Sequence, residues 1–288
     1  MSVATAPLPR RLASLVRIEH TVFALPFAYV GAFLAADGWP GAGDIFWIAV
    51  AMVGARTLAM ALNRLVDAEL DARNPRTATR ELPSGALTRV QVLALSGTAL
   101  AVFLVAVFQL DPVVRWLWPV PIVMFVVYPY LKRFTWLCHL WLGACLALAP
   151  IGAWLAVSGT APWEAWAIGG AVLLWVAGFD LFYSLFDLEH DRHEGLQSWA
   201  ARFGERGVFL GARAFHVGAV VLLAVAGAGL DVDVLYWLGV AATAVLLAYE
   251  HAIVRPGDLR RLDAAFFTVN GVISVVYCVF VALDVLVG

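Results

Sequence analysis

Two groups of oxygen-bearing side chains recur at helical spacing, each at the end of an apolar segment. Asn63, Asp67 and Asp71 fall within about 80° of one another on a helix that turns 100° per residue. Asp180, Asp187 and Asp191 fall within about 40° of one another by the same rule. Each helix would therefore present oxygen atoms along one face. Because ionised groups are costly in apolar spans, we expect both groups to be functional.

The two groups also correspond to each other in sequence. Asn63, Asp67 and Asp71 precede Tyr183, Asp187 and Asp191 by 120 residues in each case. This offset predicts a duplicated four-helix unit. Two helices related by pseudo-symmetry could point their carboxylates into one central cavity.

Clustered carboxylates repel one another unless cations lie between them. Hard oxygen ligands suit Mg²⁺, which binds through a few carboxylates, water and substrate phosphates. The predicted metal ligands are Asn63, Asp67, Asp71, Asp187 and Asp191, and the predicted catalytic residues are the same four aspartates with Asp180. Basic residues nearby predict a diphosphate site, since arginine favours bidentate phosphate contacts. They are Arg64, Arg73, Arg76, Arg80, Lys132, Arg133 and Arg202.

The composition places the chain in a membrane. Of its 288 residues, 62% are hydrophobic and 14% are charged, and the mean hydropathy is +0.85. Soluble proteins average about 45–50% apolar and about 25% charged residues. The net charge of -2, without a long run of one sign, argues against a nucleic-acid partner. Cys138, Cys145 and Cys278 lie in apolar stretches and are expected to be buried thiols.

Nine segments have the length and apolar character of membrane spans. They are residues 20–36, 45–65, 90–109, 112–130, 135–157, 165–186, 212–230, 234–252 and 264–286. Basic residues gather before the first span and after every second span, so these regions should face the cytoplasm. The sequence thus predicts an all-α protein of the inner membrane, with one domain over residues 1–288. Its long motif loops, at 63–89 and 180–211, would lie on the cytoplasmic side.

These motifs resemble those of the UbiA superfamily of intramembrane aromatic prenyltransferases. NxxxDxxxD stands here as Asn63 to Asp71, and DxxYxxxDxxxD as Asp180 to Asp191; Tyr128-Pro-Tyr-Leu-Lys-Arg133 is similar to the YPxxKR element. The resemblance implies nine helices with a cytoplasmic cap and two Mg²⁺ ions that bridge the motifs to a polyprenyl diphosphate. It also implies a lipid-facing tunnel for the prenyl tail and an aromatic ring that attacks an allylic cation.

The acceptor is predicted from shorter stretches. Those around Arg17, Asn63, Arg76 and Arg80 look most like the futalosine branch of menaquinone synthesis, whose acceptor is 1,4-dihydroxy-6-naphthoate. The alternative is 4-hydroxybenzoate, the acceptor in ubiquinone synthesis. Candidate acceptor-binding residues are Arg17, His20, Arg56 and Tyr183. Arg17 and His20 could instead anchor the chain at the membrane interface, and Arg56 could instead pair with a carboxylate.

A transporter is the rival from another class, because transporters also contain repeats and buried charges. It would place ionisable groups in mid-membrane. The acidic groups of this sequence lie at helix ends, beside basic residues suited to phosphate. The enzyme is therefore the favoured interpretation, with polyprenyl diphosphate, an aromatic acid and membrane lipid as its partners.

Overall fold

A chain this apolar folds into helices because each segment in lipid must satisfy its own backbone hydrogen bonds. The computed structural model describes residues 7–16, 21–257, 262 and 265–288, and every regular element within these ranges is a helix. They are α1 (Leu8–Val16), α2 (Thr21–Ala36), α3 (Ala42–Arg73), α4 (Arg89–Val107), α5 (Val114–Leu117), α6 (Pro119–Leu131), α7 (Cys138–Ser158), α8 (Trp163–Ser184), the 3₁₀ turn η3 (Leu185–Asp187), α9 (Leu188–His193), α10 (Trp199–Gly229), α11 (Val234–Ile253), the π-helical turn η4 (Ala265–Val269) and α13 (Asn270–Val287).

The helices correspond to the predicted spans, so the fold class is confirmed. Among the described residues, eight helical segments are long and apolar enough to cross a membrane, and Ala24–Ala36 is a shorter apolar helix. That shorter helix is the predicted first span, and Pro26 lies inside it as expected. The fourth span is divided into α5 and α6 next to Pro119. The chain is an integral membrane protein.

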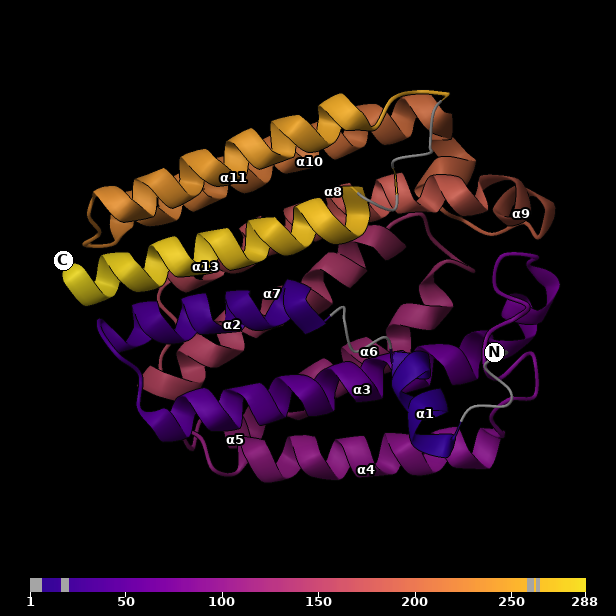
Figure 1. Cartoon of the computed structure of the whole chain (residues 1–288), viewed down its shortest axis with the longest axis horizontal. Coiled ribbons are helices and arrows are strands. Elements are labelled where there is room, and N and C mark those ends of the chain that lie inside the picture. The colour runs from indigo at the N-terminus through magenta and orange to yellow at the C-terminus, as the bar shows by residue number, and fades with distance from the viewer. Residues whose placement is uncertain (1–6, 17–20, 258–261, 263–264) are drawn as a thin grey trace.

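The long helices run side by side along the long axis of the molecule (Figure 1). Phe27 of α2 contacts Trp175 of α8 and Tyr277 of α13, with ring centroids 5.0 and 5.8 Å apart. Trp175 Nε1 donates a 2.7 Å hydrogen bond to Asn270 Oδ1, and Asn270 Nδ2 donates to Glu250 Oε1 at 3.1 Å. Aromatic packing and buried hydrogen bonds therefore join α2, α8, α11 and α13.

Two glycines allow α7 to approach its neighbours closely. A Cβ atom on Gly143 would lie 2.2 Å from the backbone oxygen of Leu173 in α8. A Cβ atom on Gly31 of α2 would lie 2.1 Å from the backbone oxygen of Pro150. Both distances are too short for real contacts, so only glycine fits. The contact between α7 and α8 positions the site, because these helices carry His139 and Asp180.

The regions predicted as long loops contain more helix than expected. α3 continues to Arg73 and carries Asp67 and Asp71 beyond the apolar segment. After α9, α10 begins at Trp199 and kinks at Gly204, where φ is +68°. Hydropathy marks where the apolar segment ends, but charged residues such as Glu and Arg also form helix well, so the helix itself does not stop there.

Contacts with α1 hold the segment between α3 and α4 in position. Arg11 donates a hydrogen bond to the backbone oxygen of Ala86, and Ser14 Oγ donates to Glu81 Oε1 at 2.6 Å. Leu15 is fully buried in a small cluster with Leu87 and its neighbours. Because this segment has few helical turns of its own, its position depends on these contacts with α1. It carries Asn74, Arg76 and Arg80 to the site described next.

Candidate active site

Both acidic motifs lie at one end of the bundle, opposite the C-terminus of the chain (Figure 1); we call it the motif end. Asp67 and Asp71 project from the last turns of α3, Asp187 from η3 and Asp191 from α9. Asp67, Asp71 and Asp191 are only 4–8% exposed. Buried carboxylates need compensating charge, so their partners define what the site can do.

Asp67 is bound by the end of α6. Lys132 Nζ lies 3.3 Å from its Oδ2 atom, and Arg133 Nη2 lies 3.3 Å from its Oδ1 atom. Asn63, one turn earlier in α3, donates an amide hydrogen bond to Oδ2 at 3.3 Å. The predicted grouping of Asn63, Asp67 and the two basic residues is thus present in the structure.

Asp71 is paired with Arg80, whose Nη1 atom lies 2.7 Å from Oδ1. The Thr77 hydroxyl donates to the backbone oxygen of Asp71 at 3.0 Å, which folds the chain after α3 back over the helix end. The other carboxylate oxygen of Asp71 is buried and accepts no hydrogen bond from the described residues. An uncompensated oxygen of this kind is a suitable ligand for an added cation.

Asp187 receives its partners from the segment that follows α3. Asn74 Nδ2 donates to its Oδ1 atom at 2.8 Å, and Arg76 donates through Nε at 2.9 Å and through Nη2. Arg76 also donates to the Tyr183 hydroxyl at 3.0 Å and lies over the Tyr183 ring. Burial lowers the pKa of Arg76, but the hydrogen bonds and charge of Asp187 outweigh it and raise that pKa above its ordinary value.

Lys132 lies between the motifs. Besides its contact with Asp67, it interacts electrostatically with Asp187 and Asp191. Four cations lie among the four aspartates: Lys132 and Arg133 pair with Asp67, Arg80 with Asp71 and Arg76 with Asp187, and Asp191 interacts with the charge of Lys132. The formal charges therefore balance, and segments 120 residues apart form one polar cluster.

Asp180 lies one to two turns deeper and has a different partner. His139 Nδ1 is 2.7 Å from Asp180 Oδ2, and the backbone N–H of Trp199 donates to His139 Nε2 at 3.3 Å. Because Nε2 accepts a hydrogen bond, the ring proton is on Nδ1, which donates to Asp180. His139 thus fixes the orientation of this carboxylate, apart from the other four.

An apolar cavity of about 620 Å³ lies between α3, α6 and α7. Arg56, Asn63 and Tyr128 are among its few polar lining residues, and Asn63 is the one that also contacts Asp67. The lining continues along α3 from Asn63 back to Ile48, about 22 Å at 1.5 Å per residue. This elongated apolar space begins at the polar cluster and extends into the membrane-spanning part of the bundle.

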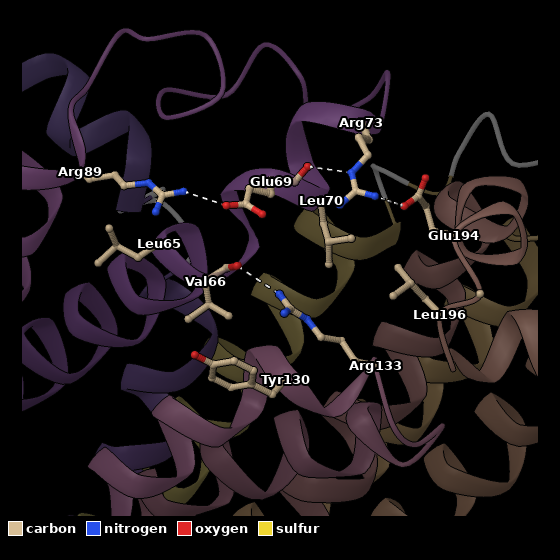
Figure 2. A pocket seen from close by; sticks show the side chains of 11 residues that line it. Leu65, Val66, Glu69, Leu70, Arg73, Arg89, Tyr130, Arg133, Glu194 and Leu196 are labelled. Carbon is tan, nitrogen blue, oxygen red and sulfur yellow. Dashed lines mark hydrogen bonds and ion pairs between the residues drawn. The ribbon is translucent and has the colours of Figure 1, made fainter.

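The remaining predicted residues are placed as follows. Arg64 is buried in α3, and Arg202 is exposed on α10, where its guanidinium lies 5.6 Å from the Phe203 ring centroid. Arg73 pairs with Glu194 at 2.8 Å (Figure 2). Arg17 and His20 lie outside the described residues. All three cysteines are free thiols; Cys138 and Cys145 are buried as expected, whereas Cys278 is half-buried.

Two residues of the cluster were missed by the sequence analysis. Asn74 lies just beyond the end of α3, where an Asn-Pro pair looks like an ordinary loop signal. His139 is a polar residue near the start of an apolar span, and that position alone could have identified it. Neither partner could be assigned from sequence, because both contacts bridge distant segments.

Comparison with known proteins identifies relatives that match most of the chain. The 4-hydroxybenzoate octaprenyltransferase of Aromatoleum aromaticum is 31% identical over 258 residues, which cover 86% of this chain and 84% of that protein. The enzyme of the same name from Cupriavidus necator is 30% identical, over 88% of this chain and 90% of that protein.

These relatives correct the predicted acceptor. The preference for 1,4-dihydroxy-6-naphthoate was wrong, because the similar proteins carry the name of the alternative acceptor, 4-hydroxybenzoate. Of the short stretches that suggested the naphthoate, those around Asn63, Arg76 and Arg80 lie at the polar cluster, and the one around Arg17 lies outside the described residues. Paired charges of this kind do not by themselves distinguish one aromatic acceptor from another.

The fold agrees with this relationship. A UbiA homologue from Aeropyrum pernix K1 is 33% identical and superposes with a TM-score of 0.85, over 93% of this chain and 98% of that chain. A UbiA homologue from Archaeoglobus fulgidus, bound to DMAPP and Mg²⁺, is 17% identical and has a TM-score of 0.76. The model of the UbiA prenyltransferase family matches residues 24–272. The chain therefore belongs to the UbiA prenyltransferase family, as an enzyme embedded in the membrane.

Proposed function

We propose that the protein transfers a polyprenyl group from a polyprenyl diphosphate to 4-hydroxybenzoate in a Mg²⁺-dependent reaction. The observation that carries this proposal is the single polar cluster formed by both acidic motifs at the mouth of an elongated apolar cavity. The names of the similar proteins support the acceptor, and the ligands of the Archaeoglobus fulgidus protein support the donor class and the metal.

The donor set fits Mg²⁺ that is shared with a substrate. Within the described ranges, no three His, Cys, Asp or Glu side chains come close enough to hold a metal by themselves. Mg²⁺ sites that use substrate phosphates need only one or two carboxylates from the protein, with water completing the octahedron. Asp67 and Asp71 on one side, and Asp187 and Asp191 on the other, suit two such ions, and the uncompensated oxygen of Asp71 is available to one of them.

The basic residues of the cluster bind the diphosphate in this proposal. Arg76, Arg80 and Lys132 now neutralise carboxylates, and phosphate oxygens can take over the same guanidinium and ammonium hydrogen bonds. Asn63 donates its amide N–H to Asp67, and its amide oxygen can act as a further ligand. The metal would supply positive charge against the charge that develops on the leaving diphosphate. The apolar walls keep water from the allylic cation.

The cavity accommodates the other parts of the substrates. We place the prenyl tail along its apolar lining and the carboxylate of the acceptor at Arg56, near the polar cluster. Asp180, oriented by His139, faces the acceptor rather than the metal. Tyr183, another predicted acceptor contact, is engaged with Arg76 and therefore also acts in positioning that arginine. We treat residues 1–288 as one functional unit.

The acceptor can be tested directly. We expect purified protein with labelled polyprenyl diphosphate and Mg²⁺ to prenylate 4-hydroxybenzoate, because its relatives carry that name. Equal concentrations of 4-hydroxybenzoate and other aromatic acids would be compared by product chromatography. Prenylation of a different acid, with 4-hydroxybenzoate left unchanged, would refute this choice of substrate while leaving prenyl transfer intact.

Two acidic residues on α9 provide a matched pair for the site. Asp191→Asn removes a buried charge proposed to bind the metal, so turnover should fall by about 10²–10³-fold, or about 3–4 kcal/mol of electrostatic stabilisation. Glu189→Gln removes the same charge two residues away, from an exposed side chain, and should leave turnover within about twofold of the wild type. Steady-state kinetics of both variants, measured on folded protein, tests this difference in turnover. Similar turnover in both variants would show that Asp191 has no such role.

We also propose that the motif end faces the cytoplasm of a cell with this protein in its inner membrane. The arginines at this end support that orientation. The C-terminus lies at the opposite end (Figure 1), so a Gly288→Cys variant without other cysteines should react with an impermeant maleimide added to intact cells. Labelling that requires lysis would mean the reverse orientation.

A further inference from the structure

A second pocket, of about 490 Å³, lies at the motif end, and Figure 2 shows the side chains that line it. Its walls come from the last turns of α3, the start of α4, the end of α6 and the turn after α9. Three arginines from three of these segments line it: Arg73, Arg89 and Arg133. Neither the proposed metal site nor the apolar cavity uses Arg73 or Arg89.

Two of the arginines are held by carboxylates that an anion could replace. Arg73 Nη1 lies 2.8 Å from Glu194 Oε2, and Arg89 Nη2 lies 3.3 Å from Glu69 Oε1. The arginine side chains are 58% and 63% exposed. The Arg89–Glu69 pair is exposed on both sides, and such pairs contribute about 0–1 kcal/mol, so exchanging Glu69 for a phosphate costs little. Glu194 is only 14% exposed, but the exposed guanidinium of Arg73 can still turn toward an anion in the pocket. Guanidinium groups bind phosphate with two parallel hydrogen bonds, which favours the exchange.

The pocket adjoins the metal-ligand residues on both sides. Arg133 Nη2 donates to the backbone oxygen of Val66, in the pocket wall, at 3.1 Å and lies 3.3 Å from Asp67 Oδ1. The opposite wall contains Leu196, whose N–H donates to the backbone oxygen of Asp191 at 2.8 Å. One wall of the pocket therefore adjoins the first acidic motif, and the opposite wall adjoins the second. Arg133 lies between the pocket and the aspartates.

We infer that this pocket binds inorganic diphosphate and is the route by which that product leaves the active site. The inference rests on the release of diphosphate in the proposed reaction, whichever acceptor is used. Diphosphate moving outward past Asp67 meets Arg133 first and then Arg73 and Arg89. A phospholipid headgroup has similar phosphate chemistry, but only the product has to pass between the two motifs.

The pocket binds through guanidinium groups, so its affinity for diphosphate does not depend on a metal. Calorimetric titration of inorganic diphosphate into the protein, in phosphatidylcholine nanodiscs with EDTA, removes the contribution of the metal. The difference between the wild type and a variant of the pocket arginines then measures the binding that belongs to this pocket. The double variant Arg73→Gln/Arg89→Gln should bind at least about tenfold more weakly than the wild type. The control Arg206→Gln/Arg255→Gln loses the same charge from exposed positions and should bind like the wild type.

A variant that is expected to bind diphosphate more tightly excludes misfolding as the cause of weaker binding. Glu69→Gln removes the carboxylate that competes for Arg89, so metal-free binding should become tighter. Absence of metal-free binding by the wild type, or equal affinity in the wild type and the Arg73→Gln/Arg89→Gln variant, would overturn the inference. No acceptor is present in this titration, so failure of 4-hydroxybenzoate as a substrate would not affect it.

A separate arm distinguishes the product from a lipid. Nanodiscs that contain phosphatidylglycerol should leave the difference between the wild type and the double variant unchanged. If phosphatidylglycerol abolishes that difference, the pocket is occupied by a lipid headgroup, and the product route is wrong.

Discussion

The two acidic motifs are held together by a short segment after α3, in which Asn74 and Arg76 both bind Asp187. Asp67 and Asp187 belong to different helices, and neither motif alone presents enough ligands for a diphosphate with its metals. The cross-link from Asn74 and Arg76, with Lys132 between the motifs, brings them into one site. The docking of α1 on Glu81 and Ala86 stabilises the segment that makes this contact.

Burial explains why these contacts are strong constraints. Charges at the edge of a low-dielectric bundle interact more strongly than in water, and a carboxylate without compensation there is costly. Four cations therefore accompany four aspartates in the structure. The same cations suit a diphosphate, so substrate and metal can enter together with little net change in charge. The second pocket, where Arg73 and Arg89 are held by replaceable partners, provides a way out for the product.

Much of this arrangement was predictable. Hydropathy located the helices, because each span needs a long apolar stretch, and the four-residue spacing placed Asn63, Asp67 and Asp71 on one face. Sequence could not show that Asn74 and Arg76 reach Asp187, or that His139 orients Asp180, because these contacts join residues more than 40 positions apart. Nor could sequence show that Arg73, on the last turn of α3, pairs with Glu194 of the segment after α9. The acceptor could not be derived from the stretches around Asn63, Arg76 and Arg80, because their side chains are engaged in the charged cluster.

The central claim is that both motifs act as one Mg²⁺-dependent diphosphate site. The most direct measurement is turnover of the purified protein in EDTA, followed by titration with Mg²⁺, for the wild type, Asp67→Asn and Asp187→Asn. The account predicts no turnover in EDTA, recovery with Mg²⁺, and a higher half-saturating Mg²⁺ concentration in both variants, although they change different motifs. Full turnover in EDTA, or a change in Mg²⁺ dependence in only one variant, would contradict it.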